Sequence, residues 1–299
     1  MGNEVQLSAP AKVNLCLYIG GRETDGYHRL VSLFQMVSLY DHIHIRSLKA
    51  KDAFRLEGEF AFPAEENIIT RAVRLFRERT GARQGVEIRV RKEIPLGAGL
   101  GGGSSDAAAV MCGLNALFAG GFDRAGLSAL ASELGSDIPF FLGAPAALVR
   151  GRGEVVEPLA PRRDFALVLV YPGFPVASRQ AYEWLDAYRG AQPAEKSRRQ
   201  LPEPAALRRM YGQDAPETWI LFNSFAPVLK KRFPLLEESK NTLKQAGAIA
   251  AGVSGSGSTV FGLFTGRDEA RRAAGKIKNG PAQVKFVEPL EKSPFTGLE

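Results

Sequence analysis

Five glycines in seven positions lie directly before a helical segment, and this feature constrains the chain more than any other. The run reads Pro-Leu-Gly-Ala-Gly-Leu-Gly-Gly-Gly-Ser-Ser-Asp-Ala-Ala-Ala, residues 95–109. Because glycine has no Cβ, such a loop can curl until its backbone N–H groups converge on an anion. The helix that follows presents unpaired N–H groups and the positive end of its dipole at the same point. The arrangement favours a site for a polyphosphate.

A flexible linker and a dinucleotide-binding loop are the alternatives for this motif. A linker does not usually run straight into an Ala-rich helix with Ser and Asp at its start. Gly97, Gly99 and Gly102 also satisfy the G-x-G-x-x-G pattern, and Asp123 follows at about the right distance. The loop lies well inside the chain, however, and its flanks indicate hairpins rather than βαβ units. The Gly-Lys-Ser/Thr ending of a P-loop is absent.

The rest of the chain mixes strands and helices. Short β-prone runs predict strands over residues 5–7, 13–19, 37–45, 85–90, 165–171, 248–253, 259–264 and 284–287. Helical periodicity predicts helices over residues 67–80, 104–118, 127–134, 178–188, 223–231, 234–245 and 268–278. Residues 189–204 are polar, basic and interrupted by proline, which indicates an exposed loop. Because hairpin-like neighbours are mixed with helices, we expect an α+β fold.

Charge and composition narrow the classes of molecule that this chain could bind. The 39 Lys and Arg exceed the 32 Asp and Glu, and a net charge of +7 attracts anions such as nucleic acid, anionic membranes or phosphorylated metabolites. The basic residues are scattered among acidic and apolar ones, so we expect no nucleic-acid partner. No run approaches the roughly 18 apolar residues of a membrane span, and no targeting peptide precedes the first strand. We expect a cytoplasmic protein without a membrane partner.

Two residue pairs could bind metal or form a disulfide. Cys16 and Cys112 each lie in an apolar segment, and we expect buried thiols rather than a disulfide. His42 and His44 share one face of a predicted strand. Zinc sites need three or four ligands and no further ligand cluster accompanies this pair, so an exposed strand face is favoured.

Three motifs in order resemble the GHMP kinases, named for galacto-, homoserine, mevalonate and phosphomevalonate kinases. They are Ala9-Pro-Ala-Lys-Val-Asn-Leu, the glycine loop, and Gly252-Val-Ser-Gly-Ser-Gly-Ser-Thr-Val-Phe-Gly. The resemblance implies a small-molecule kinase that uses ATP and Mg²⁺. It also implies a two-lobed α+β fold with mixed or antiparallel sheets and the active site in the cleft between the lobes. We expect an ATP-binding lobe over residues 1–160 and a substrate-binding lobe over residues 161–299.

A narrower resemblance concerns the acceptor. Thr24-Asp-Gly-Tyr-His, Leu39-Tyr-Asp and Leu134-Gly-Ser-Asp-Ile-Pro-Phe-Phe look like the members that phosphorylate the 2-hydroxyl of a cytidine diphosphate-linked sugar alcohol, in the non-mevalonate route to isoprenoid precursors. Homoserine or mevalonate kinase activity is the nearest alternative, and the Asp-Gly-Tyr-His stretch argues against it. A second alternative is an anion- or nucleic-acid-binding protein that has kept the fold and lost turnover; the joint presence of Lys12 and Asp137 argues against that.

The resemblance assigns the catalytic and nucleotide-binding roles. Asp137 would accept or orient the proton of the acceptor hydroxyl, and Lys12 would hold Asp137 ionised and offset developing charge. Taken alone, Asp137 suggests a helix cap and Lys12 a surface lysine. The residues expected to contact ATP are Asn67, Pro95, Leu96, Gly97, Ala98, Gly99, Leu100, Gly101, Gly102, Gly103, Ser104 and Ser105. Asn67 is equally well explained as the N-cap of its helix, and no acidic cluster identifies the Mg²⁺ ligands.

The resemblance also assigns the acceptor site, to Asn14, Tyr27, His28, Tyr182, Gly255 and Ser256. Tyr27 and Tyr182 would stack on the two faces of a cytosine ring while His28 pairs with its edge. Tyr182 could instead be a core aromatic residue on a helix. The small residues 254–258 would let the backbone approach the acceptor's phosphates, or simply form a tight turn between strands.

Overall fold

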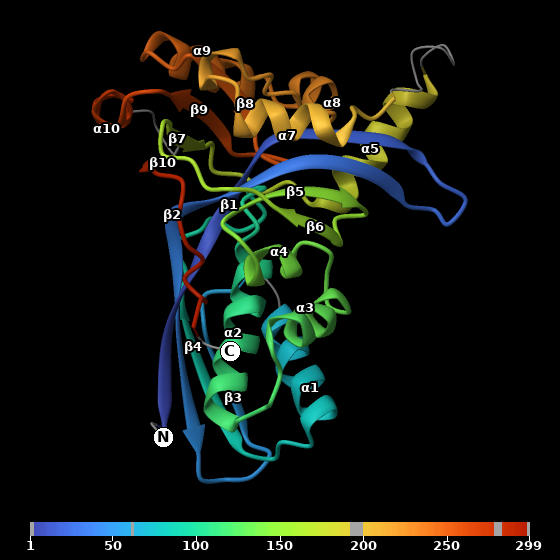
Figure 1. Cartoon of the computed structure of the whole chain (residues 1–299), viewed down its shortest axis with the longest axis vertical. Coiled ribbons are helices and arrows are strands. Elements are labelled where there is room, and N and C mark those ends of the chain that lie inside the picture. The colour runs from blue at the N-terminus through green and yellow to red at the C-terminus, as the bar shows by residue number, and fades with distance from the viewer. Residues whose placement is uncertain (1–2, 61–62, 192–199, 278–282, 298–299) are drawn as a thin grey trace.

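Two sheets and their covering helices make up the molecule (Figure 1). The computed structural model describes residues 3–60, 63–191, 200–277 and 283–297. Its strands are β1 (Glu4–Arg22), β2 (His28–Leu48), β3 (Phe54–Gly58), β4 (Gly85–Arg91), β5 (Ala146–Gly151), β6 (Val155–Pro158), β7 (Ala166–Tyr171), β8 (Ala250–Val253), β9 (Val260–Phe264) and β10 (Gln283–Val287). Its α-helices are α1 (Ile68–Thr80), α2 (Gly102–Phe118), α3 (Arg124–Ser132), α4 (Ile138–Leu142), α5 (Ser178–Gly190), α7 (Pro204–Gly212), α8 (Ala226–Arg232), α9 (Leu235–Gln245) and α10 (Arg267–Lys276).

The larger sheet has six strands and is mixed. β2 pairs with β1 on one side and with β4 and β5 on the other, and β3 joins β4 in parallel while the other pairs are antiparallel. The smaller sheet is antiparallel in the order β10-β7-β9-β8, and α9 and α10 pack against it. Mixed and antiparallel sheets with separate helical layers confirm the expected α+β class.

The first strand differs from the sequence prediction. Residues 5–7 and 13–19 were expected as separate strands, but β1 is continuous through Pro10. Proline cannot donate to a ladder, yet among the described strands β1 pairs with β2 alone and is an edge strand, where proline is tolerated. The register against β2 shifts between Pro10 and Ala11, so an irregularity in the pairing absorbs the missing bond.

Several short elements escaped the sequence prediction. They are β3, β5, β6, α4 and α7. α4 has five residues, less than two helical turns, so no periodicity could reveal it. The helix expected from residue 104 begins two residues earlier, at Gly102. Half of the predicted loop over residues 189–204 lies outside the described residues. α5 extends over its first two positions, to Gly190, and α7 begins at its last position, Pro204.

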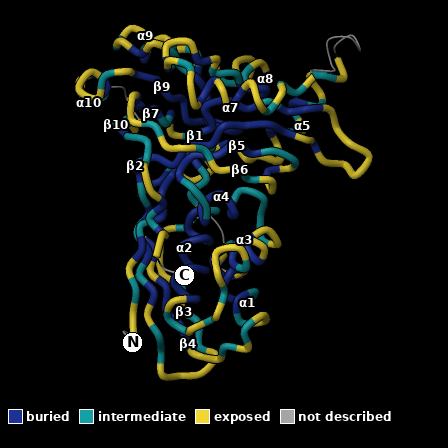
Figure 2. The backbone as a smooth tube through the Cα atoms, in the orientation of Figure 1, coloured by how far each residue is buried: buried dark blue, intermediate teal, exposed yellow. Residues whose placement is uncertain are grey.

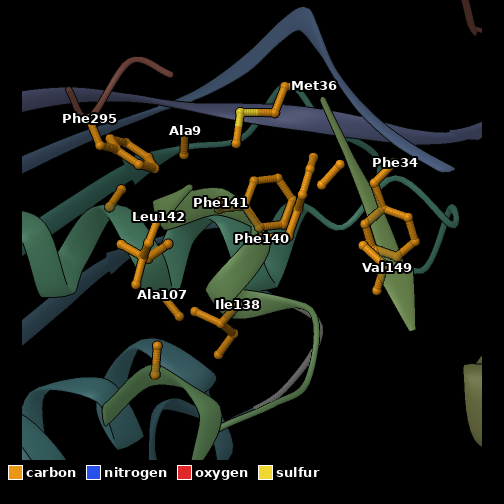
Figure 3. Packing of buried hydrophobic residues seen from close by; sticks show 14 of the residues in the cluster. Ala9, Phe34, Met36, Ala107, Ile138, Phe140, Phe141, Leu142, Val149 and Phe295 are labelled. Carbon is orange, nitrogen blue, oxygen red and sulfur yellow. The ribbon is translucent and has the colours of Figure 1, made fainter. Parts of the chain in front are cut away.

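A buried layer between α2, α4 and the larger sheet anchors the centre of the molecule (Figures 2 and 3). Every residue of α2 from Ser105 to Asn115 is buried, as expected of a helix that is apolar on all sides. Phe140 and Phe141 of α4 are fully buried, and Phe140 meets Phe34 of β2 edge-on at 5.1 Å between ring centroids. Because truncating such a phenylalanine costs about 3–5 kcal/mol, α4 is held firmly against the sheet.

The expectations for cysteine, histidine and membrane contact can be compared with the structure. Cys16 and Cys112 are both buried, and neither forms a disulfide among the described residues, as predicted. His42 and His44 lie on a partly exposed strand face, opposite Glu93 at 3.6 Å and Glu4 at 3.0 Å respectively. The described residues contain no helix of the length and apolarity needed to cross a bilayer.

Candidate active site

One cleft of about 1020 Å³ collects most of the side chains singled out from the sequence. Its walls come from β1, the tip of the β1–β2 hairpin, the glycine loop, the start of α4, the first half of α5 and the turn between β8 and β9. The predicted residues that line it are Lys12, Asn14, Tyr27, His28, Pro95 to Ser104, Asp137, Tyr182, Gly255 and Ser256. Segments separated by more than 200 residues in the chain therefore meet at one site.

Lys12 and Asp137 form an ion pair in this cleft. Lys12 Nζ lies 3.6 Å from Asp137 Oδ2, and the two side chains are 5% and 34% exposed. Burial lowers the pKa of Lys12, and the charge of Asp137 opposes that shift. The ammonium also donates to Asn14 Oδ1 and lies 4.4 Å from the centroid of the Phe34 ring. Lys12 is thus a buried, fixed cation rather than the surface lysine its strand position suggested.

The helix-cap alternative for Asp137 can be checked directly. Asp137 occupies the N-cap position of α4, but its side chain makes no capping hydrogen bond. Its carboxylate faces Lys12 and the cleft instead. An N-cap hydrogen bond contributes about 1 kcal/mol. Because Asp137 does not make this bond, its carboxylate is available to interact with groups in the cleft.

Neighbouring segments hold the glycine loop in place by donating hydrogen bonds to its carbonyl groups. Leu100 O accepts from Lys12 N at 2.9 Å, Gly99 O from Ser254 Oγ at 2.9 Å, and Ala98 O from Thr259 N at 3.1 Å. None of the backbone N–H groups of residues 96–101 donates to another described residue, so they remain available to an anion. The loop thus has unbonded N–H groups, as a phosphate-binding loop requires, and its binding of ATP stays a prediction.

Gly99 and Gly101 are required by close packing. Both have positive φ, 76° and 72°. A Cβ on Gly99 would lie 2.1 Å from Ser254 O, and a Cβ on Gly101 would lie 3.0 Å from the Lys12 side chain. The loop can approach the 254–258 turn and Lys12 only because these two positions have no side chain. Residues 254–258 lie in the turn that joins β8 to β9, and Gly255 and Ser256 of the same turn line the cleft.

Two residues expected at the nucleotide, Asn67 and Ser105, do not line the cleft. Ser105 is fully buried, and its hydroxyl has no hydrogen-bond partner among the described residues. Consecutive helical residues point about 100° apart, so Ser104 lines the cleft while Ser105 does not. Asn67 Oδ1 accepts from Ile69 N at 2.9 Å and caps α1, whereas its neighbour Ile68 lines the cleft.

A buried charge cluster beside the loop was missed by the sequence prediction. Lys92 lies within ion-pair distance of Asp41 and 2.6 Å from Asp106, and all three side chains are at most 8% exposed. Burial raises the pKa of Asp106 to about 7, with Lys92 opposing the shift and Asp41 adding to it. Asp41 and Asp106 both belong to motifs noted in the sequence, but nothing local showed that they would share one lysine.

The end of the cleft that is expected to hold the acceptor contains stacked rings. The His28 and Tyr182 rings lie 5.2 Å apart and within 19° of parallel. His28 Nδ1 is 3.1 Å from Gly20 O, and its Nε2 is 3.0 Å from Asp186 Oδ1. Burial raises the pKa of Tyr182 to about 12. Asp186 was not predicted, although it follows Tyr182 by four residues and so shares its helix face.

Comparisons with known proteins agree with this geometry. The family model "GHMP kinases N terminal domain" matches residues 67–144, and "GHMP kinases C terminal" matches residues 205–282. A 4-diphosphocytidyl-2-C-methyl-D-erythritol kinase of Treponema pallidum is 40% identical over 90% of this chain and 93% of its own. The chain belongs to the GHMP kinases.

Solved structures lead to the same family. A crystal structure of 4-(cytidine 5'-diphospho)-2C-methyl-D-erythritol kinase, 37% identical, superimposes with a TM-score of 0.78 over 96% of this GHMP kinase and all of that chain. A homoserine kinase from Cytophaga hutchinsonii, 20% identical, has a TM-score of 0.69 over 98% of this chain and 97% of its own. At that identity the second likeness concerns the fold alone.

The arrangement suits direct phosphoryl transfer by this GHMP kinase. Such transfer needs positioning, charge stabilisation and removal of one proton, and no enzyme nucleophile. The loop supplies N–H donors for phosphates, Lys12 supplies a fixed positive charge and Asp137 supplies a carboxylate, all lining one cleft.

Proposed function

We propose that this GHMP kinase transfers the γ-phosphoryl group of ATP to the 2-hydroxyl of 4-diphosphocytidyl-2-C-methyl-D-erythritol. The observation that carries the proposal is the Lys12–Asp137 ion pair in a cleft that the glycine loop and the stacked His28–Tyr182 pair also line. Relatives of about 40% identity over nearly the whole chain bear the name of this activity. The cytoplasmic location expected from the sequence stays a prediction.

The chemistry follows from the placement of the two charged groups. The acceptor oxygen attacks the γ-phosphorus, the bond from that phosphorus to the β–γ bridging oxygen breaks, and ADP leaves. The hydroxyl proton passes to Asp137, and Lys12 offsets the negative charge on the acceptor oxygen and the transferring group. The loop N–H groups hold the phosphates in place throughout.

Magnesium is expected to arrive with ATP. The described residues contain no group of three or more His, Cys, Asp or Glu side chains placed to hold a metal ion. Mg²⁺ commonly binds through substrate phosphates, water and one or two protein oxygens, so a dedicated cage is not needed. The Ser104 hydroxyl and the Asp137 carboxylate line the cleft and would be its protein ligands. The ion would neutralise phosphate charge.

The activity is tested by ADP release with three acceptors in parallel. We expect turnover with 4-diphosphocytidyl-2-C-methyl-D-erythritol and at least 100-fold lower kcat/KM with homoserine and mevalonate. Faster turnover of either competitor would overturn the acceptor assignment.

The role of Asp137 is tested in the same assay. Asp137→Asn should lower kcat by about 100-fold or more, since a positioned acid–base group typically contributes that factor. The matched control is Asp268→Asn, on the exposed first turn of α10, which should leave kcat unchanged. A kcat within threefold of the parent for Asp137→Asn would contradict the base role.

A further inference from the structure

Arg152 connects two parts of the acceptor end of the cleft. It lies in the turn between β5 and β6, and its guanidinium carbon is 4.2 Å from the centroid of the Tyr27 ring. The same guanidinium forms an ion pair with Asp25, at the tip of the β1–β2 hairpin. Arg152 and Tyr27 both line the cleft. A residue absent from the sequence prediction thus contacts the ring expected to stack on a base.

The turn that carries Arg152 also contacts the catalytic carboxylate. Gly153 has a φ of 117°, and a Cβ at that position would lie 3.1 Å from the Ser136 side chain and 3.4 Å from Asp137 Oδ1. The carboxylate of Glu154 accepts a hydrogen bond from Arg152 N and so holds the turn closed. One short turn therefore packs against the proposed base and places a cation beside the proposed base-stacking ring.

Arg22 at the hairpin tip and Arg152 in the β5–β6 turn are cations that line the cleft. Glu183 and Asp186 of α5 also line it, and their carboxylates are paired with Arg179 and His28 respectively. Arg22 Nε donates to Gly26 O at 3.0 Å, which keeps it at the same hairpin tip. The carboxylate partner, Asp25, does not line the cleft.

Arg152 can exchange Asp25 for another anionic partner at a small cost in free energy. The two side chains are 49% and 40% exposed, and ion pairs of this kind contribute about 0–1 kcal/mol. A guanidinium binds phosphate oxygens through two parallel N–H donors, and such bonds are about twice as strong as neutral ones. A phosphate entering the cleft would therefore compete well with Asp25.

We propose that Arg152 is a specificity-determining residue that binds the diphosphate of a cytidine diphosphate-linked acceptor. The inference rests on the proposed function and deepens it. Arg152 exchanges Asp25 for the phosphate oxygens, and the acceptor is thereby recognised through its diphosphate as well as its base. Homoserine has no phosphate, so it cannot use this contact.

Binding of two fragments of the acceptor distinguishes phosphate binding by Arg152 from a role that only supports the Tyr27 ring. We would measure the affinities of cytidine and cytidine 5'-diphosphate by calorimetry for the parent, Arg152→Ala and Arg152→Lys. Arg152→Ala should lower the affinity for cytidine 5'-diphosphate by about tenfold or more and the affinity for cytidine by less than twofold. Arg152→Lys should retain part of the affinity for the diphosphate. Equal losses for both ligands, or no loss for the diphosphate, would overturn the proposal.

Turnover distinguishes failure of this inference from failure of the proposed function. Arg152→Ala should raise KM for the acceptor by about tenfold or more while KM for ATP stays within twofold. Arg83→Ala is the control, since Arg83 is 73% exposed, pairs with Asp52 and does not line the cleft. If the parent phosphorylates the cytidine acceptor and Arg152→Ala keeps its KM, the inference alone fails. If the parent neither phosphorylates that acceptor nor binds the diphosphate, the proposed function fails.

Discussion

Asp137 and His28 illustrate how a partner distant in sequence decides what a residue does. Asp137 occupies a cap position but faces Lys12, which precedes it by 125 residues (137 − 12). His28 lies between Gly20 O and the carboxylate of Asp186, and its ring stacks on Tyr182. Because Nδ1 faces a carbonyl, which only accepts, that nitrogen donates and the ring orientation is set.

At the residue scale we predict that Asp186 positions His28 for the acceptor. Asp186→Asn removes the negative charge 3.0 Å from Nε2, which forms an ion pair with the ring when His28 is protonated. The expected result is an acceptor KM raised by about tenfold or more, with kcat and the KM for ATP within twofold. Steady-state kinetics with each substrate varied in turn checks this.

Two further variants control the Asp186 measurement. Glu183→Gln lies on the same helix and lines the same cleft, but Glu183 pairs with the exposed Arg179, so acceptor KM should stay unchanged. Asp186→Glu should restore part of the acceptor affinity. Equal losses in kcat and in both KM values for Asp186→Asn would indicate general damage to α5 and contradict the positioning role.

At the element scale, the buried Lys92 cluster joins β2, α2 and the segment that follows β4. Asp41 comes from β2, Asp106 from α2, and Lys92 from the residues directly after β4. Asp41 Oδ1 also accepts from Glu93 N at 2.7 Å and Ile94 N at 2.9 Å, just before the glycine loop. Two carboxylates share one ammonium, so the cluster has an excess negative charge when both are ionised.

This excess charge predicts a pH-dependent stability. The pKa of Asp106 is raised from 3.8 to about 7, so between those values the folded chain holds a proton that the unfolded chain has lost. The free energy of unfolding should therefore fall as pH rises from about 4 to about 7. Asp106→Asn lacks the titrating group. Between pH 5 and pH 8, the free energy of unfolding of the parent should therefore fall by on the order of 1–4 kcal/mol more than that of Asp106→Asn.

Denaturant unfolding at several pH values tests the prediction. Asp268→Asn, which is exposed on α10, should keep the pH dependence of the parent. Identical pH dependence in the parent and Asp106→Asn would show that Asp106 titrates normally in the folded chain.

At the scale of the whole molecule, the two halves share their cores. Each buried apolar cluster includes residues from before and after position 160. Tyr211 Oη donates to Gln35 Oε1 at 2.7 Å, and Leu290 N donates to Met36 O at 2.9 Å. The segment after β10, red in Figure 1, thus returns to β2. The division at residues 160 and 161 stays a prediction, and the shared core argues for lobes that depend on each other.

Separate expression of residues 1–160 and 161–299 tests this dependence. Neither segment should unfold cooperatively alone, since each would expose apolar surface that its counterpart buries. Mixing or co-expressing the two should restore a single transition and ADP release. A sharp unfolding transition in either isolated segment would establish an independently folding domain.

Local chemistry was enough for the features that depend on near neighbours in the chain. Periodicity located long helices such as α1, α9 and α10, and the glycine run predicted a loop before a helix. Resemblance of ordered motifs then singled out Lys12 and Asp137, which the structure brings within 3.6 Å. These signals are short-range, because propensity, capping and turn formation depend on residues within about one or two turns.

Tertiary structure alone decided which distant residues meet. Arg152 reaches Asp25 across 127 positions (152 − 25), Asp186 reaches His28, and Lys92 joins Asp41 to Asp106. The continuity of β1 through Pro10 likewise depends on its register against β2. Such contacts depend on strand register and core packing over the whole chain, so no local pattern encodes them. The sequence by itself determined the kind of chemistry, and the packed fold determined which side chains surround it.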